Sequence, residues 1–162
     1  MDPTTIETNM RTTTLALLHA FDGQWQPTAT LDLRAPECIH TIYPSSLGVP
    51  ARTKDEWAAY FSRVCPNVYD ATVGRLPRNV VPSGELTCLW MTLDDYVSDP
   101  VKRRVVARST LRAMTRVGEY MNEYCWFLTF DGPGERIVRI EEFLDGRAAG
   151  ELLAGLREKG LV

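Results

Sequence analysis

Apolar residues recur at helical spacing near the start of the chain. They predict a first helix that begins at Pro3, with Asp2 as its N-cap, and ends at Gly23. The apolar face of this helix would consist of Ile6, Met10, Leu17 and Phe21. A short second helix is expected over 28–33, and it should stop before Pro36 because the residue before a proline disfavours helical geometry.

A third helix has the clearest start signal in the chain. Thr53 and Glu56 are spaced as a capping box, in which each side chain accepts a hydrogen bond from the other residue's backbone N–H. The helix is predicted to end at Cys65-Pro66. Its apolar stripe would consist of Trp57, Tyr60, Phe61 and Val64.

The pattern changes after Pro66 from helical spacing to alternation, which predicts β-strands. The expected strands cover 68–75, 86–97, 104–114, 119–130 and 136–144, with a shorter β segment over 38–43 and a last helix over 147–159. Turns are predicted at Asp99-Pro100 and, within a hairpin, at 131–134. Helices followed by a meandering sheet indicate an α+β fold, with helices packed on one face of a mostly antiparallel sheet.

The composition indicates one globular unit. A length of 162 residues without linker or repeat predicts a single domain over 1–162, and no apolar run is long enough for a transmembrane helix. The net charge of −3 argues against nucleic acid as a main partner. Since the four cysteines lie far apart and the start lacks a signal-peptide pattern, we expect a reduced, cytoplasmic protein without a membrane partner.

Several catalytic motifs are missing from the sequence. It has no glycine-rich phosphate loop, no dinucleotide fingerprint, no Gly-x-Ser-x-Gly elbow and no paired-histidine metal motif. We therefore expect chemistry that needs no cofactor, no metal ion and no covalent nucleophile.

Alternation sorts the strand over 119–130 into two different faces. One face carries the carboxylates of Glu119 and Glu123 and should point outward. The other face is uncharged and aromatic with hydrogen-bonding tips, as small-molecule pockets are. Its residues are Tyr120, Asn122, Tyr124, Trp126, Leu128 and Phe130. The alternative is that these aromatic side chains only fill the core, although a plain core would not use Asn122 and Tyr124.

His40 and Glu142 are the candidate proton carriers. Glu142 is the one carboxylate on an apolar face that also holds Val138, Ile140 and Leu144, where burial would suit it to acid–base work; the alternative is a rim position in water. The opposite face would hold Ile137, Arg139, Glu141 and Phe143. The imidazole of His40 suits proton transfer near neutral pH, although a lone histidine is more often structural.

Five short stretches carry a resemblance to a known family. They are RAPECIH at 34–40, PSSL at 44–47, GEYMNEY at 118–124, LTF at 128–130 and RIVRIEEFLD at 136–145. With the capped helix at Thr53, their order and spacing resemble the fungal SnoaL-like proteins of the NTF2-like superfamily, and most closely the isomerases and cyclases of tetrahydroxanthone pathways. The resemblance implies a cone in which a strongly curved sheet wraps around N-terminal helices, with a deep pocket at the open end.

The resemblance also implies roles for individual residues. Glu142 falls where the epoxide hydrolases of the superfamily carry a catalytic aspartate. His40 falls at their pocket-facing tyrosine, on the strand that carries the base of the isomerases. Trp126 stands where ketosteroid isomerases have an acidic oxyanion donor, so that donor is missing here. Asn122 and Tyr124 would have to donate to the oxyanion instead.

The residues and the resemblance together predict a cofactor-independent isomerase or cyclase acting on an aromatic polyketide such as a dihydroxanthone. His40 would act as general base and then acid, with Glu142 as second proton carrier or orienting group. The walls of the substrate site would be Trp126, Trp57, Leu128 and Ile140. Apolar residues on the convex face, Cys125, Phe127 and Phe143, predict a homodimer. The alternatives are a dehydratase of the scytalone type and a non-catalytic ligand-binding or dimerisation module.

Overall fold

The computed structural model describes residues 2–20, 27–68 and 89–161. The helices are α1 (Pro3–His19), α2 (Pro27–Asp32), α3 (Lys54–Val68) and α4 (Gly146–Glu158), with a 3₁₀ turn η1 (Ser45–Leu47). The strands are β1 (Arg34–Tyr43), β2 (Arg52–Thr53), β3 (Leu89–Asp99), β4 (Arg104–Thr115), β5 (Gly118–Phe130) and β6 (Ile137–Leu144). The strand predicted over 68–75 lies outside the described residues, except for Val68, which ends α3.

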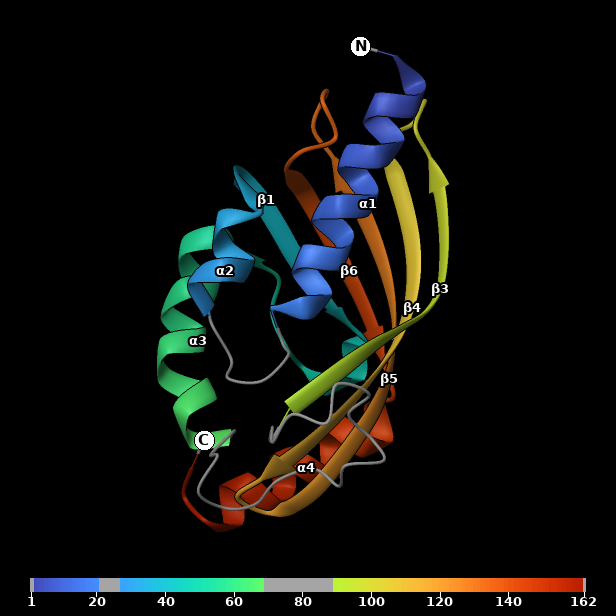
Figure 1. Ribbon diagram of the computed structural model, residues 1–162. Coiled ribbons are helices and arrows are strands. Elements are labelled where there is room, and N and C mark those ends of the chain that lie inside the picture. The colour runs from blue at the N-terminus through green and yellow to red at the C-terminus, as the bar shows by residue number, and fades with distance from the viewer. Residues whose placement is uncertain (1, 21–26, 69–88, 162) are drawn as a thin grey trace.

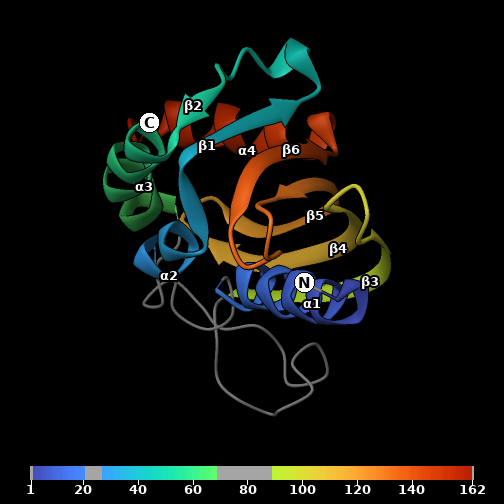
Figure 2. The ribbon, with the colours of Figure 1, turned by 90° about the horizontal axis from the view of Figure 1, so that it is seen from above.

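One six-stranded sheet, in the order β2-β1-β6-β5-β4-β3, forms the body of the fold. β1 runs parallel to β6, and the other neighbouring strands are antiparallel. The sheet is strongly curved and does not close; α1 lies along β3, and α2 and α3 lie beside β1 (Figures 1 and 2). α4 packs against β5. This arrangement confirms the predicted α+β class and the curved, mostly antiparallel sheet.

Several element bounds differ from the prediction. α1 ends at His19, before Gly23 is reached. α3 continues past Cys65 to Val68, although Pro66 has no N–H to donate to the carbonyl four residues earlier. The sheet also begins before residue 68, since β1 starts at Arg34 and pairs with β2 and β6. A two-residue strand such as β2 has too few positions to show alternation.

Side chains of the N-terminal helix α1 are hydrogen-bonded to the β5–β6 turn. Asn9 donates its side-chain N–H to the carbonyl of Pro133 at 2.9 Å, and Thr13 donates its hydroxyl to the carbonyl of Glu135 at 3.0 Å. Gly134 has a φ of +77°, and a Cβ there would come within 2.9 Å of the carbonyl oxygen of Ile6. The turn therefore needs glycine both for its backbone angle and for the close approach of α1.

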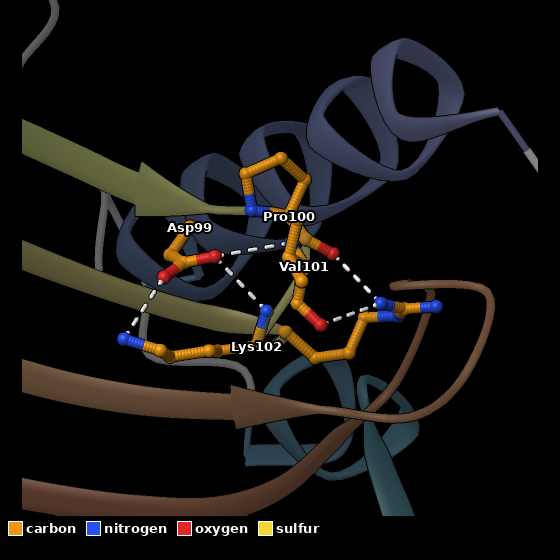
Figure 3. Close-up of polar contacts among 5 residues, drawn as sticks. Asp99, Pro100, Val101 and Lys102 are labelled. Carbon is orange, nitrogen blue, oxygen red and sulfur yellow. Dashed lines mark hydrogen bonds and ion pairs between the residues drawn. The ribbon is translucent and has the colours of Figure 1, made fainter.

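The predicted turn at Asp99-Pro100 joins β3 to β4. Hydrogen bonds from the side chains of Asp99 and Arg103 to its backbone stabilise it. Figure 3 shows the Asp99 carboxylate accepting the backbone N–H groups of Val101 and Lys102, at 3.0 and 2.9 Å. Arg103, at a φ of +57°, donates Nη1 to the carbonyls of Pro100 and Val101. Its Nε reaches a carbonyl of the β5–β6 turn at 2.9 Å, which ties the two turns together.

The inner face of β5 is the one that alternation predicted. Its six side chains, Tyr120, Asn122, Tyr124, Trp126, Leu128 and Phe130, are all buried. Ile140 and Glu142 of β6 are buried on the same side of the sheet, whereas Glu123 is exposed and Glu141 is half-buried. The pairing of β5 and β6 thus places the two predicted inner faces side by side.

A β-bulge at the start of β6 changes which of its residues face inward, so the predicted faces are wrong there. Phe130 pairs with Ile137 whereas Thr129 pairs with Arg139, so Val138 is an extra residue in the ladder. Strict alternation put Ile137 on the outer face with Arg139, but Ile137 is fully buried. The bulge accounts for the difference, because one extra residue reverses the face of the residues before it.

The convex face of the sheet exposes a band of apolar side chains. They are Ile39, Val106, Met121, Phe127 and Phe143, each between 38% and 46% exposed. Phe143 stacks on Tyr43 and contacts the edge of Phe127, so part of the band is a continuous aromatic surface. None of the described helices is long and apolar enough to cross a membrane.

Candidate active site

The fold brings the two predicted proton carriers into contact. His40 lies on β1 opposite Ile140 of β6, and Glu142 lies opposite Ile42, so both side chains project from the inner face of adjacent strands. Nε2 of His40 and Oε2 of Glu142 are 2.8 Å apart. The two residues are 3% and 8% exposed, respectively. Glu142 is therefore buried, and the alternative of a rim position in water is ruled out.

The hydrogen bond fixes which ring nitrogen of His40 can act as a base. When Glu142 accepts this hydrogen bond as a carboxylate, Nε2 carries the proton and Nδ1 keeps its lone pair. Nδ1 is buried and has no hydrogen-bond partner. Burial lowers the pKa of His40 below the ordinary 6.5, although the hydrogen bond and charge of Glu142 partly offset this effect. The imidazole is thus neutral at neutral pH, with one unpaired basic nitrogen.

Aromatic rings from a helix and a strand enclose the imidazole. The ring of Trp57, on α3, lies 4.5 Å from that of His40 between centroids, and the ring of Trp126, on β5, lies at 6.4 Å. Trp126 stacks on Tyr124 and donates its indole N–H to the hydroxyl of Ser109 at 2.8 Å. The two predicted tryptophan walls therefore flank His40.

The predicted aliphatic walls lie in the same part of the sheet. Ile140 pairs with His40 on one side and with Leu128 on the other. Both aliphatic side chains are almost fully buried within the main hydrophobic core. Their contact with a substrate stays a prediction.

The amide of Asn122 is hydrogen-bonded within the protein. Its amide donates to the hydroxyl of Tyr120 at 2.6 Å and to the carbonyl of Asp145 at 3.1 Å, and its Oδ1 accepts the N–H of Asp145 at 2.9 Å. Both amide hydrogens are thus donated within the protein, and donation from Asn122 to a substrate oxyanion stays a prediction. Asn122 fixes the junction where Asp145 caps α4.

Tyr124 is also engaged within the protein. Its ring stacks on Trp126 with centroids 5.4 Å apart, and its side chain is hydrogen-bonded to the hydroxyl of Tyr120. Tyr124 is 7% exposed. It lies on the predicted face, and a direct bond from it to a substrate stays a prediction.

Arg34 is a buried residue beside this site that was not among the predicted site residues. This residue opens β1 and is 2% exposed, with its guanidinium carbon 5.8 Å from the centroid of the Trp57 ring. Arg34 pairs with Ile137, and Ile39 pairs with Arg139. An advance of five residues along β1 therefore matches an advance of only two residues along β6. This irregularity interrupts the alternation between Arg34 and the rest of β1, so the face of Arg34 could not be assigned from the alternation pattern.

Within the described ranges, no group of three or more His, Cys, Asp or Glu side chains is arranged to hold a metal ion. Chemistry without a cofactor stays a prediction. The site's own chemical groups are a neutral base, a carboxylate that orients it, a buried cation and aromatic walls. Such a set can take a proton from a substrate and hold the charge that results.

Comparison with curated proteins finds relatives of moderate similarity. No family model matches the chain. The chain is 28% identical over 137 residues to the monooxygenase AacuP of Aspergillus aculeatus, covering 83% of this chain and 82% of that protein. It is 26% identical over 132 residues to the monooxygenase nsrQ of Aspergillus novofumigatus, covering 82% and 76% of the respective chains.

Comparison with solved structures identifies the fold. The pinacolase BvnE from Penicillium brevicompactum has a TM-score of 0.76 at 19% identity, covering 98% of this chain and 97% of that chain. PrhC from Penicillium brasilianum has a TM-score of 0.71 at 20% identity, covering 94% and 93%. A protein described as a SnoaL-like polyketide cyclase from Jannaschia sp. has a TM-score of 0.62 at 16% identity, covering 95% and 97%. The chain therefore has the fold of the SnoaL-like proteins of the NTF2-like superfamily.

Proposed function

We propose that the protein is an enzyme of fungal polyketide metabolism, a cofactor-independent isomerase or cyclase acting on an aromatic polyketide such as a dihydroxanthone. The observation that carries this proposal is the buried His40–Glu142 pair, joined at 2.8 Å, with Nδ1 of His40 unpartnered. A neutral imidazole oriented by a carboxylate is suited to act as a general base. The tryptophan rings beside it suit a flat ring system.

The reaction begins when Nδ1 of His40 removes a proton from a carbon next to a carbonyl group, which leaves an enolate. Glu142 holds the ring through Nε2–H and stabilises the positive charge that the imidazole acquires. The imidazolium then returns the proton at another position of the conjugated system or to the group that closes a ring. The product is an isomer or a cyclised compound, and the base is restored.

The names of similar proteins support a role of this kind and also favour a second candidate. One structural neighbour is named a pinacolase, and another is described as a polyketide cyclase. Both curated relatives are named monooxygenases. The second candidate is therefore an oxygenase, in which the same base forms the enolate and molecular oxygen then adds to the enolate carbon. The carbon is oxidised, the oxygen is reduced to a peroxide, and the proton held by His40 completes a hydroperoxide product.

Product mass distinguishes these reactions. The purified protein is incubated with a dihydroxanthone in deuterium oxide under isotopically labelled oxygen gas, and products are analysed by liquid chromatography and mass spectrometry. An isomerase or cyclase leaves the elemental composition unchanged, and deuterium enters the product only if the imidazolium exchanges its proton with solvent before returning it. An oxygenase introduces labelled oxygen, a dehydratase removes one water, and a carrier gives no product. His40→Ala is the control, and product formed equally fast by this variant would refute the proposed base.

We propose in addition that two copies associate through the convex face of the sheet. The support is the exposed apolar band that contains Phe127, Phe143 and Val106. Val106 pairs with Phe127 on adjacent strands, and Phe127 contacts Phe143, so the exposed groups are contiguous. Contiguous exposed apolar surface is typical of an association site.

A further inference from the structure

A buried guanidinium lies beside the proposed base and has no part in the steps described above. Arg34 is 2% exposed, and its guanidinium carbon lies 5.8 Å from the ring centroid of Trp57 and 6.0 Å from that of Phe61. Trp57 in turn lies 4.5 Å from the ring of His40. Arg34 and His40 therefore contact the same indole.

The charge of Arg34 is not compensated by a close partner. Its Nε and Nη1 atoms are buried and have no hydrogen-bond partner. In the part of the chain that the structure describes, no carboxylate lies within ion-pair distance of this guanidinium. The nearby carboxylate of Glu142 is bonded to His40 instead. A buried cation whose donors lack acceptors destabilises a free protein, so its presence calls for a functional reason.

Two other buried polar atoms near Arg34 also lack hydrogen-bond partners, and together with Arg34 they could bind one polar ligand. Nδ1 of His40 and Nε1 of Trp57 are also buried without partners. Three neighbouring side chains thus supply one lone pair and at least three N–H donors. A ligand that satisfies this set must carry an acidic hydrogen for His40 and an electron-rich oxygen for the donors.

We propose that Arg34 is the oxyanion-binding residue of this site, and that its guanidinium and the adjacent Trp57 N–H donate to the anionic oxygen of an enolised aromatic ketone. The proposal rests on the proposed function, since the enolate is formed by His40. When the base removes a proton next to a carbonyl, negative charge develops on the carbonyl oxygen. A buried, preoriented cation stabilises that charge, and its donors are unpaired, whereas the amide of Asn122 is already hydrogen-bonded within the protein.

A stable enolate tests this inference without any turnover. The probe is 2-hydroxy-1,4-naphthoquinone, which is ionised at neutral pH, and its neutral counterpart is 2-methoxy-1,4-naphthoquinone; 2-naphthoate tests whether a carboxylate is bound instead. Affinities are measured by quenching of tryptophan fluorescence. The wild-type protein should bind the enolate on the order of ten- to a hundred-fold more tightly than the methoxy compound. Arg34→Met should remove this preference and leave the affinity for the methoxy compound unchanged.

Arg52→Met is the matched control. Arg52 also stacks on Trp57, with its guanidinium carbon 5.1 Å from the ring centroid, but it is only half-buried. This variant should keep the preference for the enolate. Arg34→Met should also unfold at a higher temperature than the wild type, because it removes an uncompensated buried charge. Arg34→Gln replaces Arg34→Met in the binding series if the methionine variant fails to fold.

Three results would overturn the inference: equal affinity of the wild type for the enolate and the methoxy compound, a preference for 2-naphthoate alone, or an enolate preference that survives in the Arg34 variants. The proposed function is judged separately by product formation. Loss of enolate preference in Arg34→Met would support the anion site even if no dihydroxanthone is converted. Conversion without enolate preference would support the function and refute the role of Arg34.

Discussion

Glu142→Gln tests the proposed base most directly, because glutamine keeps the shape of the side chain and removes its charge. Glu142 is 8% exposed and lies 2.8 Å from Nε2 of His40. A charge-assisted hydrogen bond contributes about 1.5–3 kcal/mol, or roughly a 10- to 150-fold change in rate. The glutamine amide can also donate to Nε2, which would place the ring proton on Nδ1 and disable the base. Both effects together predict a loss of turnover of roughly 10²–10⁴-fold.

The pH dependence gives a second readout of the same substitution. Burial lowers the pKa of His40 below 6.5, and the hydrogen bond and charge of Glu142 act in the opposite direction. A base works in its neutral form, so wild-type kcat/KM should be constant near neutral pH and fall on the acid side with a midpoint below 6.5. Since Glu142→Gln removes contributions that raise this pKa, its midpoint should move to still lower pH.

The assay measures initial rates of product formation across the acid range, with substrate affinity measured by tryptophan fluorescence. Glu141→Gln is the matched control, because Glu141 is the preceding residue on the outer face and lies 3.9 Å from Arg139 at the surface. It should leave rate and midpoint unchanged. Full turnover in Glu142→Gln, or an acid midpoint that rises, would show that Glu142 is not the partner of the base.

Three further experiments test the base, the predicted dimer and the fold. His40→Ala should lower turnover by roughly 10²–10⁴-fold while circular dichroism stays unchanged, and near-normal turnover would make His40 structural. Replacing Phe127 and Phe143 by serine should convert a dimer to a monomer in light scattering; a monomeric wild type would contradict the proposed interface. Gly134→Ala should reduce the free energy of unfolding in urea by roughly 2–4 kcal/mol, since a Cβ at a φ of +77° would meet a carbonyl oxygen of α1 at 2.9 Å. Gly132→Ala, where a Cβ meets nothing within 4 Å, should change it far less.

Alternation in the sequence predicted the part of the site that lies on regular strands. Along β5, side chains change face at every residue without interruption, so Trp126 was placed correctly from parity alone. Glu142 and His40 were likewise placed on the inner face, and their contact follows from the parallel pairing of β1 with β6. The parallel pairing itself was not predicted, because β1 precedes β6 by about a hundred residues and no local signal joins them.

The features that sequence analysis missed depend on irregular backbone or on bonds to distant residues. Arg34 and Ile137 lie beside interruptions in the strand register, and period-two alternation cannot be carried across such a point. Asn122 was assigned to the oxyanion because an amide on an aromatic face has no evident core partner. Its actual partner is the backbone of Asp145, which becomes its neighbour only when β6 pairs with β5 and turns into α4.

Hydrogen-bond satisfaction separates the structural polar groups of the inner face from those available to a ligand. The indole of Trp126 is paired with Ser109, and Asn122 is paired with Tyr120, so these groups stabilise the folded chain by themselves. Nδ1 of His40 and the Nε and Nη1 atoms of Arg34 are equally buried but have no hydrogen-bond partner. Desolvated groups of that kind reduce the stability of the free protein, and in the proposed site a bound ligand supplies their partners. Binding of an enolate should therefore raise the unfolding temperature of the wild type by mass action, and by much less in a protein that lacks Arg34.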